Sequence, residues 1–341
     1  MYTITRQLEN SGTVLSKLLE AVQNLNGSLD IYLDQIGNAE VLIPAQNNPD
    51  SAPAQINESI SPQFFEALGI RSMALRASHG RLAFPDAAQI DFDRKNAAQY
   101  RWRKIKNELN IEDFKMLLRN SQIISFEDWA NLNGAADLWD GILFDVIRSL
   151  DKKDFDFIFY LGDITKRRAN EVDEILDIIS DYSFYGRVTL MLDENEATKL
   201  WAILYNLDPD ISFADIKSLG LRQKYLSTFD SLGIDQLLIY AGDQTLLLSG
   251  QKQFELVGKE ITKGKTPQVM RSNFNAGYSL GLLLGLDISL CVALAQSITE
   301  VFAENGTRPD RNALLTYIKN WNDELKKEEE NPSINQPSLF Y

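Results

Sequence analysis

Apolar strand-like runs alternate with helix-like segments between residues 122 and 240, and this alternation limits the fold more than any other feature. A typical unit is the apolar run Phe155–Leu161 followed by a helical pattern over Arg168–Ile179. The runs Arg187–Leu192 and Gln236–Tyr240 continue the scheme. Strands separated by helices of ten or more residues require right-handed crossovers and a mostly parallel sheet covered on both faces. The sequence therefore predicts a three-layer α/β protein.

The remaining segments complete one domain. Two long helices are expected over Phe274–Leu286 and Ile288–Glu304, and a last helix over Ala313–Lys327. Residues 28–95 contain several prolines and only short strand-like runs, which indicates a small, degenerate β insertion. We therefore expect an α/β domain over residues 1–327, with a lid-like insertion at about 28–95, and a flexible C-terminal tail over 328–341.

The composition excludes several classes of function. The chain has 341 residues with 34 Lys and Arg against 48 Asp and Glu, so its net charge is −14. This acidic balance argues against a protein that coats nucleic acid or an anionic membrane. The single cysteine (Cys291) and single histidine (His79) exclude a disulfide framework and most zinc sites. Because no signal peptide or membrane-spanning run is visible, we expect a cytoplasmic protein.

Four sequence blocks follow one another in the second half of the chain. They are Asp163–Arg167 (DITKR), Val188–Ala197 (VTLMLDENEA), Leu238–Leu247 (LIYAGDQTLL) and Ser272–Leu286 (SNFNAGYSLGLLLGL). Together they resemble the PfkB carbohydrate kinases of the ribokinase-like superfamily over about residues 120–321. The resemblance implies a ribokinase-like sandwich with a small β lid, and ATP- and Mg²⁺-dependent phosphoryl transfer to an alcohol group of a sugar or nucleoside.

The last block contains both the most specific match and the main departure from the family. The family's signature reads Gly-Ala-Gly-Asp, one residue, then Phe-Asn-Ala-Gly before a long helix. The second half is intact here, and the resemblance places Asn275 and Gly277 at the cofactor site. Ser272 stands where the family has its catalytic base Asp, and Val269-Met270-Arg271 replace the glycine-rich turn. A serine is no base near neutral pH unless another group activates it, so the sequence predicts a pseudokinase with a binding or regulatory role.

The second and third blocks each leave two interpretations open. The resemblance implies that Asp193 and Glu196 order Mg²⁺ and phosphate, with Glu196 as the metal-binding residue. The same pair at spacing i, i+3 is also an ordinary helix-capping box, which we favour. The resemblance places Gly242 and Asp243 beside the nucleotide, although a Gly-Asp pair is equally typical of a hairpin turn.

Other functions also stay open at this point. An active kinase with a rearranged site would use ATP and Mg²⁺ and give Asp193, Glu196 or Asp243 new roles, whereas a pseudokinase needs no cofactor. A homodimer through the lid is a further hypothesis. The tail residues Gln336, Leu339 and Phe340 resemble the short peptide by which bacterial proteins bind the replication sliding clamp. The simpler interpretation is a tail that folds back onto its own domain.

Three basic or aromatic features have simple structural explanations. Lys166-Arg167-Arg168 follows a strand end, where doubly wound sheets bind ligands, but a solvated helix start is the default. In Arg101-Trp-Arg-Lys104 we expect an inward tryptophan and outward cations. We expect Cys291 to be buried and inert, and Trp129 and Trp139 to be packing residues.

Overall fold

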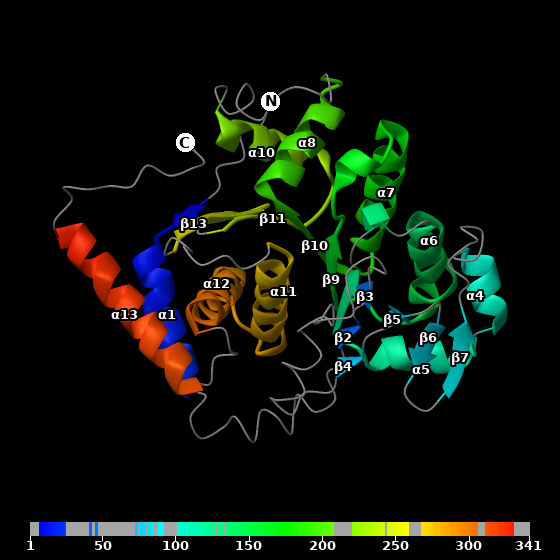
Figure 1. The fold of residues 1–341 in the computed structure, drawn as a ribbon, viewed down its shortest axis with the longest axis horizontal. Coiled ribbons are helices and arrows are strands. Elements are labelled where there is room, and N and C mark those ends of the chain that lie inside the picture. The colour runs from blue at the N-terminus through cyan, green and yellow to red at the C-terminus, as the bar shows by residue number, and fades with distance from the viewer. Residues whose placement is uncertain are drawn as a thin grey trace.

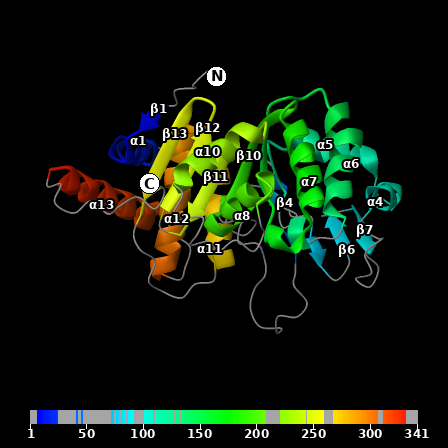
Figure 2. The same ribbon diagram turned by 90° about the horizontal axis from the view of Figure 1, so that it is seen from above.

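The structure is a computed structural model in which helices and strands form three layers (Figures 1 and 2). It describes residues 7–24, 41–42, 45–46, 72–73, 76–78, 81–84, 87–91, 101–108, 110–126, 129–131, 134–207, 220–242, 244–258, 267–305 and 311–330.

The middle layer is a sheet whose described strands run in the order β1-β13-β12-β11-β10-β9-β8-β2-β4. Its pairs are parallel, except that β12 is antiparallel to both β11 and β13. The strands are β1 (Gln7–Glu9), β2 (Val41–Leu42), β4 (Ser72–Met73), β8 (Ile123–Phe126), β9 (Phe155–Tyr160), β10 (Gly186–Asp193), β11 (Gln236–Ala241), β12 (Gln244–Ser249) and β13 (Lys252–Val257). The mostly parallel sheet predicted from the sequence is confirmed.

A second, smaller sheet lies within the region where the sequence predicts a lid. Its described strands have the order β3-β5-β6-β7. They are β3 (Ala45–Gln46), β5 (Arg76–Ser78), β6 (Arg81–Phe84) and β7 (Ala87–Asp91). That this small sheet closes over a ligand stays a prediction.

Helices cover both faces of the central sheet (Figure 1). One face carries α1 (Ser11–Asn24), α11 (Pro267–Leu283), α12 (Ile288–Asn305) and α13 (Arg311–Glu330). The other carries α4 (Trp102–Glu108), α5 (Ile111–Asn120), α6 (Ala135–Asp145), α7 (Ala169–Tyr182), α8 (Glu194–Leu204) and α10 (Leu221–Ser231). Three short 3₁₀ turns, η2 (Trp129–Asn131), η3 (Ile147–Ser149) and η4 (Ile164–Lys166), lie between these elements. No helix in the described part is long and apolar enough to cross a membrane.

Successive residues of the buried strands point to opposite helical layers. In β11, Leu237 and Ile239 pack with the α6–α10 layer, while Leu238 packs with the α11–α13 layer. This period of two explains why the strands read as continuous apolar runs, since both of their faces are buried. Trp129 and Trp139 are buried in the first of these layers as predicted.

Two helices of the face that carries α1, namely α11 and α13, have other bounds than the sequence predicts. The first long helix was expected to begin at Phe274, but α11 begins at Pro267, about two turns earlier. The final helix continues to Glu330, three residues into the predicted tail. Pro267 is well suited to a helix start, because the proline ring fixes a helical φ and the missing N–H has no intrahelical partner there.

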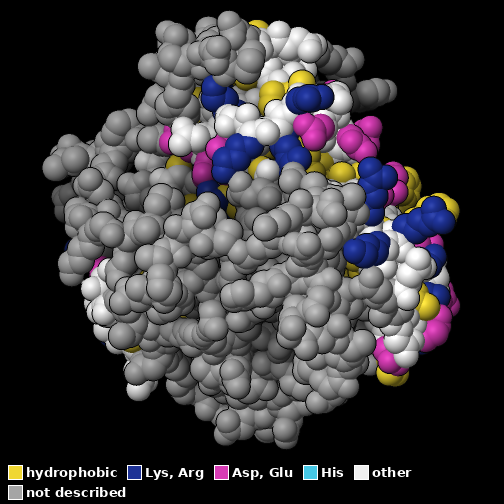
Figure 3. All heavy atoms as spheres, turned by 45° about the vertical axis from the view of Figure 1, so that its right-hand side comes forward, with side chains coloured by type: hydrophobic (Ala, Val, Ile, Leu, Met, Phe, Trp, Pro, Cys, Tyr) yellow, Lys and Arg dark blue, Asp and Glu magenta, His cyan; other side chains and the backbone are white. Residues whose placement is uncertain are grey.

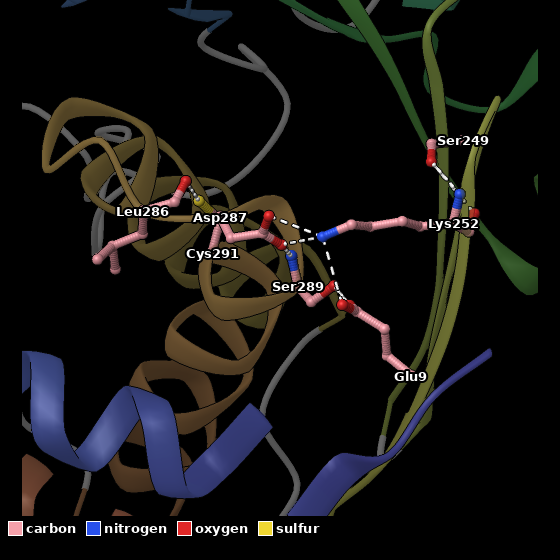
Figure 4. A network of polar contacts seen from close by, with 7 residues as sticks. All are labelled: Glu9, Ser249, Lys252, Leu286, Asp287, Ser289 and Cys291. Carbon is pink, nitrogen blue, oxygen red and sulfur yellow. Dashed lines mark hydrogen bonds and ion pairs between the residues drawn. The ribbon is translucent and has the colours of Figure 1, made fainter. Parts of the chain in front are cut away.

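The N-terminal strand β1 extends the sheet beyond the antiparallel pair β12–β13. Glu9 of β1 lies beside Phe254 of β13 in register. The Lys252 ammonium of β13 lies 3.3 Å from Glu9 Oε1 and 2.7 Å from Asp287 Oδ2 (Figure 4). The hydroxyl of Ser289 donates to Glu9 as well. This polar network fastens the N-terminal strand to the turn between α11 and α12.

Candidate functional site

A small cavity opens at the carboxyl ends of β9, β10 and β11. This edge of a parallel sheet is where α/β proteins usually bind ligands. The helix α11 closes the cavity from one side. The residues that line it are Tyr160, Met191, Leu192, Asp193, Leu238, Tyr240, Arg271 and Phe274. The cavity therefore brings together the second sequence block (Asp193) and the segment just before the last one (Arg271).

Asp193 and Glu196 form the capping box that the sequence predicts at the start of α8. The Asp193 carboxylate accepts from the Glu196 N–H at 2.8 Å, and the Glu196 carboxylate accepts from the Asp193 N–H at 2.8 Å. The Tyr160 hydroxyl donates to Glu196 Oε1 at 2.7 Å. Burial raises the pKa of the Asp193 carboxyl, against the effect of the N–H groups that it accepts. The capping interpretation is confirmed, and Glu196 is itself buried.

A guanidinium occupies the space in front of these two carboxylates. Arg271 Nη2 lies 2.6 Å from Asp193 Oδ2 and 3.6 Å from Glu196 Oε1. The centre of the guanidinium lies 4.1 Å from the centroid of the Tyr160 ring. This arrangement combines an ion pair with a cation–π contact. In the sequence, Arg271 stands out only as a replacement for a glycine, and nothing near it in the chain indicates the contact with Asp193 and Tyr160.

The segment that replaces the glycine-rich turn is helical. Residues 269–272 lie in the first two turns of α11. In an α-helix, each N–H beyond the first four bonds to the carbonyl oxygen one turn earlier. The N–H groups of residues 271–274 are therefore committed to the helix. Ser272, which stands at the position of the family's base, lies within this same helix.

Asn275 and Gly277 of the intact part of the motif lie inside the protein rather than around the cavity. The amide of Asn275 donates to Ser125 Oγ at 3.4 Å and accepts from the Ser279 hydroxyl at 3.4 Å. Gly277 faces α12, where an added Cβ would come within 2.7 Å of the Ala295 Cα. The structure thus gives both residues a packing role, and their predicted cofactor contact stays a prediction.

The turn at Gly242 forms the hairpin between β11 and β12. Ala241 pairs with Gln244 across it, and Gly242 has a φ of +74°. The positive φ explains the glycine, because a side chain would strain this conformation. The hairpin interpretation is confirmed for Gly242. Asp243 lies outside the described residues.

A buried polar cluster that the sequence did not reveal connects this hairpin to the α11–α13 layer. Gln296 of α12 donates to the Gly242 carbonyl at 3.2 Å and to Glu300 Oε1 at 2.5 Å. It accepts from the Thr245 hydroxyl at 3.0 Å. The Tyr317 hydroxyl of α13 donates to Glu300. The sequence does carry a signal for this cluster, because the polar residues Gln296 and Glu300 lie four positions apart in an otherwise apolar helix.

The basic and sulfur-containing candidates have structural roles. Arg167 donates to the carbonyl oxygens of Ala130 and Trp129 and pairs with Glu171, so it holds η2 against α7. Burial raises the pKa of the Cys291 thiol to about 12, as expected for an inert cysteine. Trp102 is buried, and the neighbouring cations of α4 are exposed; both expectations are confirmed.

The surface offers no large patch of one sign on the described part of the face in Figure 3. Lys and Arg side chains lie among Asp and Glu side chains there. The predicted tail contact through Gln336, Leu339 and Phe340 lies outside the described residues, as does His79.

The residues of this site do not fit a divalent cation as they stand. The oxygens that would coordinate it belong to Asp193 and Glu196, and Arg271 already provides positive charge between them. In the described part of the chain, no group of three or more His, Cys, Asp or Glu side chains is placed to hold a metal. A metal could enter only if Arg271 moved away.

Comparisons with known proteins agree with this fold. A family model described as prokaryotic ketohexokinase matches residues 32–321. The pyridoxal kinase from Staphylococcus aureus shares 13% identity and a TM-score of 0.51, over 78% of this chain and 88% of that one. The ribokinase from Thermotoga maritima shares 13% identity and a TM-score of 0.46, over 86% of each chain.

The nucleoside kinase from Methanocaldococcus jannaschii shares 14% identity and a TM-score of 0.44, over 86% of this chain and 85% of that one. No curated protein sequence matches the chain. The likeness to the pyridoxal kinase confirms the ribokinase-like fold, and the family model covers most of the sequence. The chain therefore belongs to the prokaryotic ketohexokinase family.

Proposed function

We propose that this member of the family has lost phosphoryl transfer and acts as a binding or regulatory pseudokinase. The observation that carries the proposal is the helical conformation of residues 269–272, together with the ion pair between Arg271 and Asp193. Phosphoryl transfer needs a base for the attacking hydroxyl and donors that stabilise the transferred group. Both requirements are weakened by the same segment of chain.

The base is the first requirement. A carboxylate near the acceptor hydroxyl can take its proton, whereas the Ser272 hydroxyl is itself protonated at neutral pH. Among the described residues, the carboxylate that lines the cavity is Asp193, which pairs with Arg271. The buried Glu196 beside it accepts from Tyr160. Both carboxylates already bond to groups of the protein, and these contacts compete with the acceptance of a proton from a ligand hydroxyl.

Donors for the transferred group are the second requirement. A glycine-rich turn before a helix presents several backbone N–H groups to an anion. In α11 those of residues 271–274 lie beyond the first turn and bond within the helix. Within the segment that the resemblance aligns with that turn and the base, the N–H groups of residues 271 and 272 are therefore not available to an anion.

The family description indicates a ketohexose as the ligand class. Purified protein would be titrated calorimetrically with fructose, other ketohexoses and nucleosides, with and without ATP and Mg²⁺. Parallel assays would follow ADP release. We expect binding of at least one ligand and no turnover of any. Turnover of any of these compounds would refute the proposal.

An active kinase with a rearranged site is the second candidate. It is favoured by one observation, since the Arg271 guanidinium could provide the positive charge that the glycine-rich turn no longer gives. The substitution Ser272→Asp, with Ser272→Asn as the uncharged control, separates the candidates. A gain of activity only in Ser272→Asp would indicate lost chemistry on an intact frame. Loss of an existing activity would indicate a rewired site.

Two partner proposals concern the insertion and the tail. A homodimer through the 28–95 region would double the mass measured by light scattering, and deleting the second sheet would restore the monomer mass.

A sliding-clamp contact through the tail would be lost on deletion of residues 332–341, measured by surface plasmon resonance with purified bacterial clamp. The absence of a binding response from the full-length protein would refute the contact.

A further inference from the structure

The Arg271 side chain provides the cation of a site that is formed by two carboxylates and an aromatic ring. Two carboxylate oxygens, Asp193 Oδ2 and Glu196 Oε1, face its Nη2 at 2.6 and 3.6 Å. The Tyr160 ring covers one face of the guanidinium at 4.1 Å. Anionic oxygens and an aromatic face are the groups that stabilise a guanidinium.

The other contacts of the site hold the two carboxylates in place for this cation. The Tyr160 hydroxyl donates to the same Glu196 oxygen that faces Arg271, at 2.7 Å. The capping box fixes Asp193 and Glu196 relative to each other at the start of α8. The acceptor geometry is therefore set by the backbone of α8 and by β9, so it does not depend on Arg271 being present.

Two departures from the family motif, the helical conformation of this segment and the arginine at position 271, act together here. A helix from Pro267 places residue 271 one turn into α11, beside the cavity. An arginine at that position reaches Asp193, which is 78 residues away in the sequence. A glycine has no side chain that could reach Asp193. The helix fixes the backbone position from which the Arg271 side chain extends. Helix and charge are both needed for this contact.

We infer that Arg271 is an internal cation that takes the place of a divalent metal between Asp193 and Glu196, so that the site binds its ligand without Mg²⁺. An arginine keeps its charge at all accessible pH values and binds carboxylates with fixed geometry. A divalent metal would have to displace the guanidinium, whose single positive charge already offsets one of the two carboxylates. The inference deepens the proposed loss of phosphoryl transfer, but it concerns metal binding and is measured separately.

The test is a titration with Mn²⁺ alone, in which free Mn²⁺ is followed by electron paramagnetic resonance. The variants are Arg271→Gln, Arg271→Lys and the double variant Arg271→Gln/Asp193→Asn. Arg103→Gln, on the exposed face of α4, is the matched control. We expect the wild type, Arg271→Lys and Arg103→Gln to bind Mn²⁺ at least tenfold more weakly than Arg271→Gln. The double variant should lose the gained binding.

Two results would overturn the inference. One is tight Mn²⁺ binding by the wild type that Asp193→Asn abolishes, because a metal would then share the site with Arg271. The other is a folded Arg271→Gln protein that binds Mn²⁺ no better than the wild type. The wild-type titration decides the first point even if Arg271→Gln fails to fold. The two proposals fail on different measurements. Substrate turnover would refute the proposed function, whereas the Mn²⁺ titrations alone decide whether Arg271 takes the place of a metal.

Discussion

Gly277 of α11 lies so close to α12 that a Cβ at this position would come within 2.7 Å of the Cα of Ala295. The contact is with backbone, which cannot rotate away as a side chain can. We therefore expect Gly277→Ala to push the two helices apart and to lower the free energy of unfolding by about 2 kcal/mol. Urea unfolding followed by circular dichroism measures the change.

Gly250→Ala is the matched control for this prediction. Gly250 lies in the turn between β12 and β13, where an added Cβ meets nothing within 4 Å. Its free energy of unfolding should stay within about 0.5 kcal/mol of the wild type. Equal losses in both variants would show that the close approach of α11 and α12 is not what requires Gly277.

The buried Glu196 should contribute more to stability than Glu171, the similar residue in the first turn of α7, whose carboxylate accepts from the Arg168 N–H. Glu196→Ala removes the acceptor of the Tyr160 hydroxyl and one of the carboxylates that face Arg271. We expect a loss of about 3 kcal/mol, because buried charges lose their partner. Glu171→Ala, at the more exposed start of α7, should cost about 1 kcal/mol. Thermal unfolding of the two variants side by side tests the difference.

The ion pair between Lys252 and Asp287 predicts a defined pH dependence. Burial lowers the pKa of Lys252, but Asp287 and Glu9 outweigh it, so the pKa is raised. Burial likewise opposes the effect of Lys252 on Asp287, whose pKa is lowered overall. A raised lysine pKa stabilises the fold until the pH rises through it, above about 10.4. A lowered aspartate pKa stabilises the fold until the pH falls through it, below about 3.9.

Lys252→Met should therefore cost about 1 kcal/mol near pH 7, as is usual for partly exposed pairs. The difference from the wild type should shrink at both extremes of pH. Lys319→Met, on the exposed face of α13, should show no such profile. A Lys252→Met deficit that stays constant from pH 3 to pH 11 would contradict the ion-pair explanation.

Cys291 should be unreactive while the protein is folded. Its side chain is fully buried, and burial raises its pKa to about 12, so very little thiolate forms at pH 8. We expect labelling by a disulfide reagent such as DTNB to require unfolding and to proceed at once in guanidinium chloride. Rapid labelling of the native protein would show that the start of α12 opens readily.

The sequence predicted the parts of the fold that are local. The continuous apolar runs predicted β9, β10 and β11, because both faces of these strands are buried. The spacing of Asp193 and Glu196 predicted the capping box at α8, since both of its hydrogen bonds join residues three apart. The same analysis identified Ser272 and the replaced glycines as the departure from the family.

Local pattern could not predict where α11 begins. The intact motif suggested a start at Phe274, but nothing between Pro267 and Phe274 breaks a helix, and packing of Met270 and Asn273 in the interior extends it. Propensity over a few residues is a weak signal, and tertiary contacts usually decide such boundaries.

What the sequence determined by itself is the alternation of strands and helices and the capping box of α8. What only the tertiary structure decided is the set of partners that meet across layers. Arg271 reaches Asp193 across 78 residues, and Lys252 reaches Asp287 across 35. Such contacts depend on strand order and helix placement, which no short-range pattern encodes, because the energy that fixes them comes from burying both faces of the whole sheet.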